Sequence, residues 1–296
     1  GAGGSARSSG SILVGTDSGR VFLSRLEGDK GDVGLEQVFV AAEAMPITGL
    51  WWTRRPAPTE GATSPQFLAL VATPSRLYQF AGTGSLRATF AAASQGLEFR
   101  EMPCDINGSE SVRGLGQLRY LPVSSRVKRE RVAWCTQLGV LHGTLVQVGK
   151  DLPVQSLLSG TRLVPHEEVP LGVMLLPFHL ARLYEGRVEV VSLQTQRVVF
   201  LERLDGAMRG VIQDEKDQSL WMVGRDAIFE LVADDTHRMV WREFVDMGEF
   251  DTARGLCELP EEEDEVWYAE AEQHFRRGDA LLAAALFSKV RLAKLE

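Results

Sequence analysis

The sequence predicts a mainly β fold, a β-propeller that leads into the first helices of an α-solenoid. Two observations carry this prediction. Apolar strands joined by short polar or glycine turns recur along most of the chain. A run with helical periodicity then begins at Trp241, where Trp241, Phe244 and Val245 have the i, i+3, i+4 spacing of an amphipathic helix.

Five segments share one order of parts, an apolar strand, a short polar or glycine turn, and an alternating strand. They cover residues 12–26, 67–80, 131–145, 179–193 and 219–232. Their spacing of roughly 40–60 residues matches the period of four-stranded propeller blades. No WD dipeptide or kelch-like double glycine marks the blades, so a β-sandwich with long loops is the competing interpretation.

Changes in composition predict the domain boundaries. Residues 1–10, GAGGSARSSG, are interpreted as a flexible linker or an expression remnant. We expect propeller blades over residues 11–234 and the start of α-solenoid repeats over residues 235–296. If early blades of the propeller are absent from this sequence, we expect that the remaining blades do not close a ring.

The last part of the chain carries helix boundary signals. Gly248 suits the residue that follows the first helix, Asp251 suits the cap of the second, and Pro260 suits the start of the third. An antiparallel pair, divided at Gly278 and Asp279, is expected to meet through small and aromatic residues. These are Ala269, Ala271, Phe275, Ala283, Ala284 and Phe287. Since one helix pair cannot bury its apolar face alone, we expect the solenoid to continue in a longer protein.

The composition excludes several classes of function. A formal net charge of -8 argues against a nucleic-acid-binding surface, and the basic run RVKRER, residues 126–131, is interpreted as a solvated loop beside a strand. No apolar run approaches the roughly 18–20 residues that cross a bilayer, so any membrane role is expected to be peripheral. Cys104, Cys135 and Cys257 are far apart and odd in number, which predicts neither disulfides nor a zinc site and favours a reducing compartment.

No catalytic, cofactor-binding or metal-binding residue is predicted. The sequence has no phosphate-binding, dinucleotide-binding, nucleophile-elbow or zinc-protease motif. The glycine-rich pieces at residues 28–34 and around Gly82 and Gly84 are interpreted as turns, because they lack the following helix and the lysine that phosphate binding requires. No histidine has a partner at metal-ligand spacing; the histidines are His142, His166, His179, His237 and His274.

Acidic and aromatic residues also have structural interpretations. His166, with Glu167 and Glu168, is expected in a polar loop between blades. The run EEEDE, residues 261–265, stands at a helix start, where carboxylates stabilise the exposed N–H groups. Trp241 is expected to seat the first tail helix against the last blade. Most of the remaining tryptophans are expected in the core: Trp51, Trp52, Trp134, Trp221 and Trp267.

Several stretches together resemble the vacuolar protein sorting-associated protein 18 family, also called deep orange. The helical stretches are VWREFVDMGEFDTARGLC from Val240 and AEAEQHFRRGDALLAAALFSKV from Ala269. The β stretches are GSILVGTDSGRVFLSRL from Gly10, SRLYQFAG from Ser75, VAWCTQLGVLHGTL from Val132, LLPFHLARLYEGRVEVVSLQTQRVV from Leu175 and LWMVGRDAIFELV from Leu220. They follow the family's order over nearly the whole chain. Two segments depart from the family pattern in charge. VKRERVAW replaces a more neutral approach to its strand, and RGLCELPEEEDE is more acidic than the pattern.

The resemblance implies a non-enzymatic scaffold subunit of the HOPS and CORVET complexes, which tether late endosomal, lysosomal or vacuolar membranes before fusion. Its implied partners are the other class C subunits, with SNAREs or Rab GTPases reached through the complex. It implies neither a cofactor, a nucleic acid nor a small-molecule substrate. The location implied is the cytosolic face of those membranes. The family's first blades, long solenoid and zinc-binding RING are expected outside this sequence.

Two alternatives stay open at this point. One is a propeller-based hydrolase, resembling glycosidases, that would need two carboxylates converging with an arginine in a central cleft. The other is a coat or transport scaffold of the same architecture, which would differ only in its partners.

Overall fold

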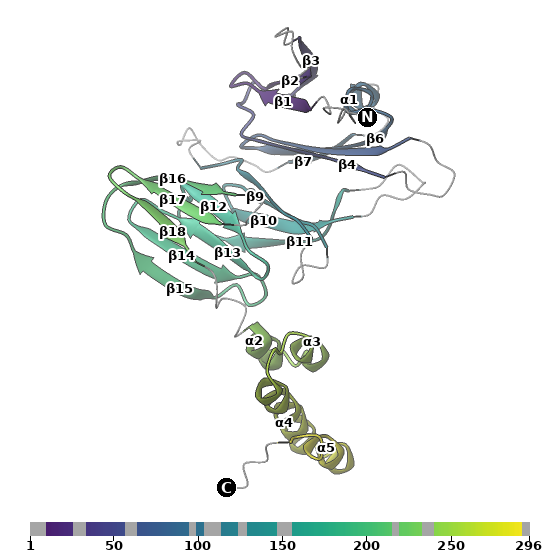
Figure 1. Cartoon of the computed structure of the whole chain (residues 1–296), viewed down its shortest axis with the longest axis vertical. Coiled ribbons are helices and arrows are strands. Elements are labelled where there is room, and N and C mark those ends of the chain that lie inside the picture. Colours follow the sequence, from purple (N-terminus) through teal and green to yellow (C-terminus); the bar gives the residue numbers. More distant parts are fainter. Residues whose placement is uncertain are drawn as a thin grey trace, which may run out of the picture.

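The computed structural model describes residues 10–25, 34–56, 64–94, 99–103, 114–123, 129–146, 156–214, 219–232 and 240–291. Its β part consists of five antiparallel sheets that follow one another along the chain (Figure 1). The first sheet holds β1 (Ser11–Gly15), β2 (Arg20–Arg25) and β3 (Leu35–Val40). The second holds β4 (Gly49–Arg55), β5 (Gln66–Ala72), β6 (Arg76–Thr83) and β7 (Phe99–Pro103).

The other three sheets repeat the same up-and-down order. The third holds β8 (Leu118–Leu121), β9 (Arg131–Cys135), β10 (Gly139–Leu145) and β11 (Leu158–Pro165). The fourth holds β12 (Gly172–Leu175), β13 (His179–Leu183), β14 (Arg187–Ser192) and β15 (Val198–Arg203). The fifth holds β16 (Met208–Gln213), β17 (Leu220–Gly224) and β18 (Ile228–Leu231). The expected four strands per sheet therefore hold for the middle three sheets, whereas the first and last have three described strands.

All five predicted hairpins are present. They are the pairs β1–β2, β5–β6, β9–β10, β13–β14 and β17–β18. The first turn shows why the local sequence suffices: Gly19 has φ +78, and a Cβ there would lie 3.0 Å from the carbonyl oxygens of Glu43 and Met45. Only glycine meets both conditions without strain. Short turns and alternating strands thus determine the hairpins.

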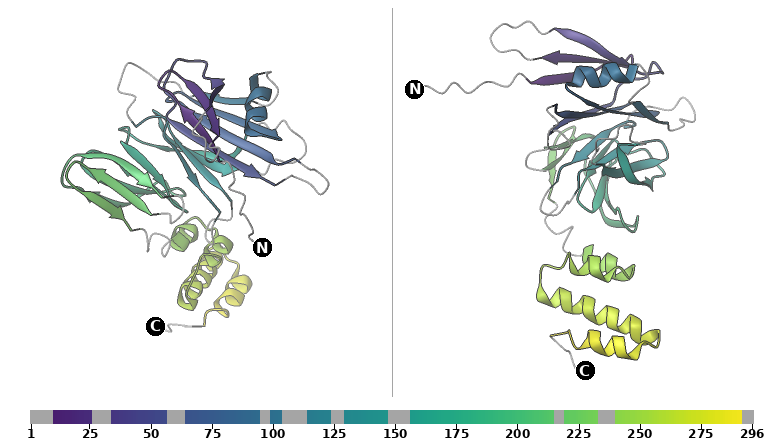
Figure 2. Two further views of the ribbon diagram at one scale, coloured as in Figure 1. Left: turned by 45° about the horizontal axis from the view of Figure 1, so that its top comes forward. Right: turned by 90° about the vertical axis from the view of Figure 1, so that its right-hand side faces the viewer.

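The sheets are stacked side by side as a fan (Figure 2). Their first strands, β1, β4, β8, β12 and β16, contact one another in that order. Ile12 and Val14 on the first sheet, and Ile212 and Ile228 on the last, are exposed. Within the described residues the sheets do not close a ring, as predicted. A sandwich would have two face-packed layers, so the five-sheet stack excludes that alternative.

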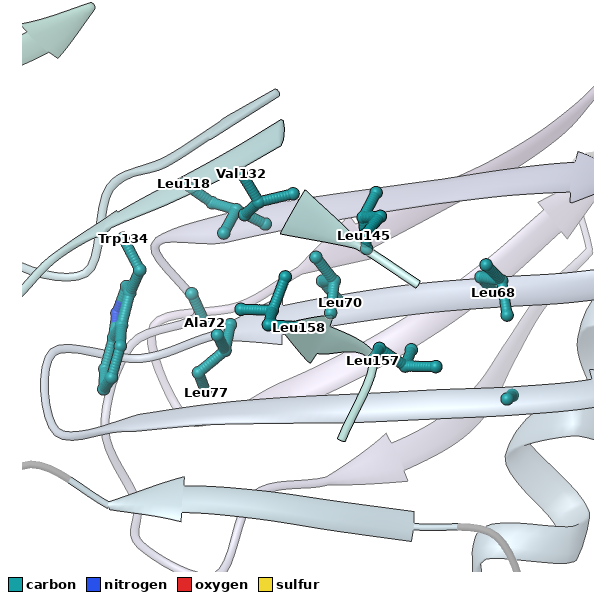
Figure 3. Packing of buried hydrophobic residues seen from close by; sticks show 11 residues of the cluster. Leu68, Leu70, Ala72, Leu77, Leu118, Val132, Trp134, Leu145, Leu157 and Leu158 are labelled. Carbon is teal, nitrogen blue, oxygen red and sulfur yellow. The ribbon is translucent and has the colours of Figure 1, made fainter. Parts of the chain in front are cut away.

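Apolar side chains fill the space between successive sheets. Figure 3 shows the cluster between the second and third, where Leu70 and Leu77 face Leu118, Val132 and Trp134. The Trp134 side chain is 1% exposed, and its Nε1–H donates to the Thr73 carbonyl oxygen at 3.3 Å, so this ring links the two sheets. Similar clusters lie between the other neighbouring sheets. Burial between sheets, as in propeller blades, is the main source of cohesion.

One helix in the β part contradicts the prediction that the glycines near residue 82 form a turn with no helix after it. Helix α1 (Leu86–Ser94) follows Gly84, and the Ser85 hydroxyl accepts a hydrogen bond from the Ala88 N–H at 3.1 Å. The helix packs on β6, where a Cβ on Gly82 would lie 2.7 Å from Thr89 Oγ1. Gly82 therefore permits close packing between strand and helix.

Four helices follow the sheets: α2 (Val240–Asp246), α3 (Phe250–Arg254), α4 (Pro260–Arg276) and α5 (Ala280–Phe287). Gly248 has φ +75 after α2, and Pro260 is the first residue of α4, as predicted. Asp251 is wrong as a cap, because it lies inside α3 and Glu249 holds the cap position. None of the described helices has the length and apolar character needed to cross a membrane.

The α4–α5 contact is only partly as predicted. Ala271 and Ala283 are buried, and the Tyr268 and Phe287 rings meet edge to face with centroids 5.5 Å apart. Phe275 was expected in this contact but is 65% exposed, and Ala284 is also exposed. Both lie on faces of the pair that no described element covers.

Candidate functional site at the junction of sheets and helices

The junction of the β part with the helices is built around α2. Val240, Trp241 and Phe244 are the buried residues of α2, and they form a cluster with Phe250 of α3. Phe178, in the turn between β12 and β13, packs against this cluster. Trp241 therefore belongs to a domain junction, as predicted, but the sheet that supplies Phe178 is the fourth and not the last.

A polar contact lies beside this apolar cluster. The Ser192 hydroxyl, at the end of β14, donates a hydrogen bond to Glu243 Oε2. The same hydroxyl oxygen accepts hydrogen bonds from the N–H groups of Gln194 and Thr195, at 3.2 and 3.1 Å. His179 Nε2 lies 3.7 Å from Glu243 Oε1. The carboxylate of α2 is thus held by two strands of the fourth sheet.

The environment favours the ionised form of Glu243. Burial raises the pKa of this carboxyl, but the interactions with His179, Ser192 and Thr195 outweigh burial, and the pKa lies below its ordinary value. Glu243 is therefore an anion at neutral pH, and the hydrogen bonds fix where α2 begins on the sheet. The arrangement joins α2 to two strands of the fourth sheet.

The predicted histidines lie apart from one another. His142 is buried between the third and fourth sheets, and burial lowers its pKa to about 4. His166 lies in the loop after β11, as expected, with Nε2 3.0 Å from the Thr136 carbonyl oxygen. His274 Nδ1 lies 3.3 Å from Asp279 Oδ2 on the helices. His237 lies outside the described residues.

The described part of the chain has no group of three or more His, Cys, Asp or Glu side chains that could hold a metal ion. Burial raises the pKa of the Cys135 thiol to about 12 and that of Cys257 to about 11, so both are protonated at neutral pH. Cys104 and most of the glycine piece 28–34 lie outside the described residues.

The hydrolase alternative needs an arginine with two carboxylates, and one arrangement of this kind is centred on Arg76. Arg76, at the start of β6, pairs with Glu43 at 2.6 Å and with Glu101 on β7. β7 is the outermost strand of its sheet, whereas a central cleft would be lined by first strands such as β4. Hydrogen bonds from Arg76 and Ser75 lower the pKa of Glu43, so this carboxyl cannot serve as a proton donor near pH 7.

Residues of both charged runs, EEEDE at 261–265 and RVKRER at 126–131, make hydrogen bonds within the folded chain. Glu262 accepts hydrogen bonds from the N–H groups of Glu258 and Leu259, at 2.8 and 3.1 Å, which supports the interpretation as a helix start. In the basic run, Arg131 begins β9 and donates to the Pro177 carbonyl oxygen at 2.6 Å. Arg131 is half-buried, so the prediction of a solvated loop is wrong for this residue. Residues 126–128 lie outside the described part.

The positions of the tryptophans agree only in part with those expected from the sequence. Trp134 and Trp241 are buried, and Trp51, Trp52 and Trp267 are half-buried. Most of these tryptophans were expected in the core, but Trp221 is 36% exposed on the outer face of the last sheet. Phe178, Ser192 and Glu243 were not singled out from the sequence. The only local signal was Glu243, a carboxylate in the first turn of a helix.

Comparison with known proteins accounts for this succession of hairpins and helices. A family model described as the Pep3/Vps18/deep orange β-propeller domain matches residues 3–233. The chain belongs to this family. Its β part is therefore a propeller domain of the Pep3/Vps18 type, and it is followed by a few helices.

Curated relatives of this Pep3/Vps18 family member extend the match into the helices. The chain is similar to the vacuolar protein sorting-associated protein 18 homolog of Danio rerio, with 29% identity over 96% of this chain and 30% of the relative. It is similar to the vacuolar sorting protein 18 of Arabidopsis thaliana, with 24% identity over 94% of this chain and 29% of the relative. The chain thus spans under a third of the length of these relatives.

Solved structures similar to this Pep3/Vps18 family member include one described as a β-propeller domain. The Myceliophthora thermophila Cps50 (Swd1) β-propeller domain has a TM-score of 0.45 and 14% identity, over 75% of this chain and 62% of that one. Saccharomyces cerevisiae Sqt1 has a TM-score of 0.42 and 13% identity, over 75% of this chain and 55% of that one.

Proposed function

We propose that this chain is part of a non-enzymatic scaffold subunit of HOPS/CORVET membrane-tethering complexes. One observation carries the proposal: relatives named vacuolar protein sorting-associated protein 18 match 96–97% of the chain, sheets and helices together. In this role the stacked sheets present loops to partner proteins, and the helices begin a rod that spans distance. The subunit acts in vesicle docking and fusion at late endosomes and lysosomes or vacuoles, on the cytosolic face of their membranes.

The junction supports a scaffold role. Glu243 and the cluster around Trp241 hold α2 against the fourth sheet, so force applied to the helices is transmitted to the sheets. We propose that residues 11–234 form the propeller unit and residues 235–296 the start of the solenoid. The partners are the other class C subunits, and contact with SNAREs, Rab GTPases and membranes is made through the complex.

The test is capture of the other class C subunits by purified chain, with residues 235–296 present or deleted. Loss of capture on deletion assigns binding to the helices, and retained capture assigns it to the sheets. Leu281 is 91% exposed on α5, so Leu281→Asp is expected to weaken capture if α5 contacts the partner. Thr252→Asp, at an exposed position of α3, is the matched control. Failure of the chain to capture any class C subunit contradicts the proposed function.

A further inference from the structure

The outer edge of the fourth sheet is unusually apolar. β15 is its outermost strand and pairs only with β14 in the described part of the chain. The apolar residues of β15 are half exposed, at 50% for Val198, 48% for Val199, 44% for Phe200 and 57% for Leu201. An outermost strand also leaves one row of backbone N–H and C=O groups without strand partners, which is a template for a further strand.

The neighbouring sheet shows how such an edge is usually protected. Its outermost strand, β11, has Gly160, Thr161 and Arg162 at its exposed positions, followed by Leu163 with 36% exposure. Charged residues make an edge a poor template, and glycine weakens a strand. β15 has neither over its four apolar residues. A register shift opposite Val190 and Val191 places Val199 as an extra residue, and all six residues of β15 are exposed.

The apolar residues of β15 stand between two opposite charges. Arg197 precedes them and Glu202 follows them, and both side chains are exposed. Neither side chain makes an ion pair or a side-chain hydrogen bond within the described residues. The strand thus has a basic residue, then four apolar residues, then an acidic residue. This pattern is self-complementary when two such strands run antiparallel. A second strand of the same sequence then places its acid opposite the base and its base opposite the acid.

We propose that two copies of this chain associate through antiparallel pairing of their β15 strands. Arg197 of each copy lies opposite Glu202 of the other, Val198 opposite Leu201, and Val199 opposite Phe200. Both charge pairs form together because the two-fold symmetry makes the interface isologous. Edge pairing also gives backbone hydrogen-bond partners to both strands on either side of the Val199 bulge. Extended segments are commonly recognised by this kind of strand addition. The second copy is the occupant that fits, since β15 itself supplies the complementary pattern.

The test measures the oligomeric state of the 296-residue chain by analytical ultracentrifugation over a range of micromolar concentrations. Wild type is expected to form a dimer whose fraction rises with concentration. Arg197→Glu alone and Glu202→Arg alone place like charges opposite each other, and each is expected to raise the dimer dissociation constant by about tenfold or more. Glu230→Arg reverses an exposed glutamate on β18, outside the proposed interface, and is expected to leave the constant unchanged.

Mixing the two weakened variants gives the decisive measurement. A chain with Arg197→Glu and a chain with Glu202→Arg have complementary edges, so the mixture is expected to form a heterodimer. The double variant Arg197→Glu with Glu202→Arg is expected to recover the homodimer. Circular dichroism of each variant verifies that it folds. A wild-type chain that stays monomeric at every concentration overturns the proposal, as does a dimer that neither single variant weakens or that the mixture fails to restore.

Discussion

His142 illustrates at the scale of one residue how position overrides chemical type. The imidazole is 3% exposed, and neither ring nitrogen has a hydrogen-bond partner within the described residues. Arg162 lies opposite it across β10 and β11, and the charges of Arg131 and Arg162 lower its pKa further after burial, to about 4. A histidine in this place is a neutral packing residue at physiological pH.

Replacing this histidine tests the pKa through stability. In the unfolded chain a histidine binds a proton below about pH 6.5, whereas folded His142 stays neutral until about pH 4. The unfolded state therefore binds more protons in this window, and stability falls as the pH decreases through it. The free energy of unfolding, measured in urea, falls between pH 7 and pH 5. For His142→Leu this fall is expected to be about 1–2 kcal/mol smaller than for wild type. His274→Gln, on the helices, is the control, and equal losses in all three proteins contradict the assignment.

Two tryptophans of opposite exposure provide a second test at this scale. Trp134 lies between the second and third sheets, so Trp134→Ala leaves a cavity and a lost hydrogen bond, and is expected to cost about 3–5 kcal/mol of unfolding free energy. Trp221→Ala removes a ring that is already 36% exposed and is expected to cost less than about 1 kcal/mol. Chemical denaturation of both variants measures the difference. Similar losses would mean that Trp221 is also a core residue.

At the scale of elements, helix α1 shows the limit of reading turns from glycine content. The interpretation of residues 81–85 as a turn was right for Gly84, which has φ +89, but it missed the helix that Ser85 caps. The alanine-rich segment after Ser85 contained the signal, because alanine has the highest helix propensity. What the sequence could not tell is that the helix covers β6.

The packing of α1 on β6 predicts the effect of a single methyl group. Gly82→Ala places a Cβ 2.7 Å from Thr89 Oγ1 and 2.9 Å from Thr89 Cα, so the helix must move, at a cost of about 1–3 kcal/mol. Thermal unfolding and hydrogen exchange of residues 86–94 measure the loss. Gly186→Ala is the control, because a Cβ there has no neighbour within 4 Å. Unchanged protection of α1 in Gly82→Ala would show that strand and helix are not in close contact.

At the scale of the whole molecule, the helices are joined to the fourth sheet, while the last sheet of the chain lies beyond it in the fan. Phe178 packs against the α2 cluster from the turn between β12 and β13. Phe178→Ala is expected to weaken the junction by about 1–3 kcal/mol through lost apolar burial. Hydrogen exchange in α2 should then accelerate while exchange in β5 and β9 is unchanged.

The matched control for the junction is another hairpin turn. Leu138, in the turn between β9 and β10, is 58% exposed and distant from the α2 cluster. Leu138→Ala is expected to leave exchange in α2 at the wild-type rate. If Phe178→Ala behaves in the same way, then the apolar contact does not hold the helices, and the hydrogen bond between Ser192 and Glu243 must suffice.

The sequence alone determined the hairpins and most helix boundaries, because alternation, short turns and glycines such as Gly19 and Gly248 act within a few residues. It also predicted the fan of sheets and the helices after them, through the repeat spacing and the family resemblance. Only the tertiary structure decided that Trp221 and Phe275 are exposed, that α1 covers β6, and that Phe178, Ser192 and Glu243 meet. Each of these depends on the free energy of packing segments far apart in the chain, and local periodicity does not record which faces find a partner.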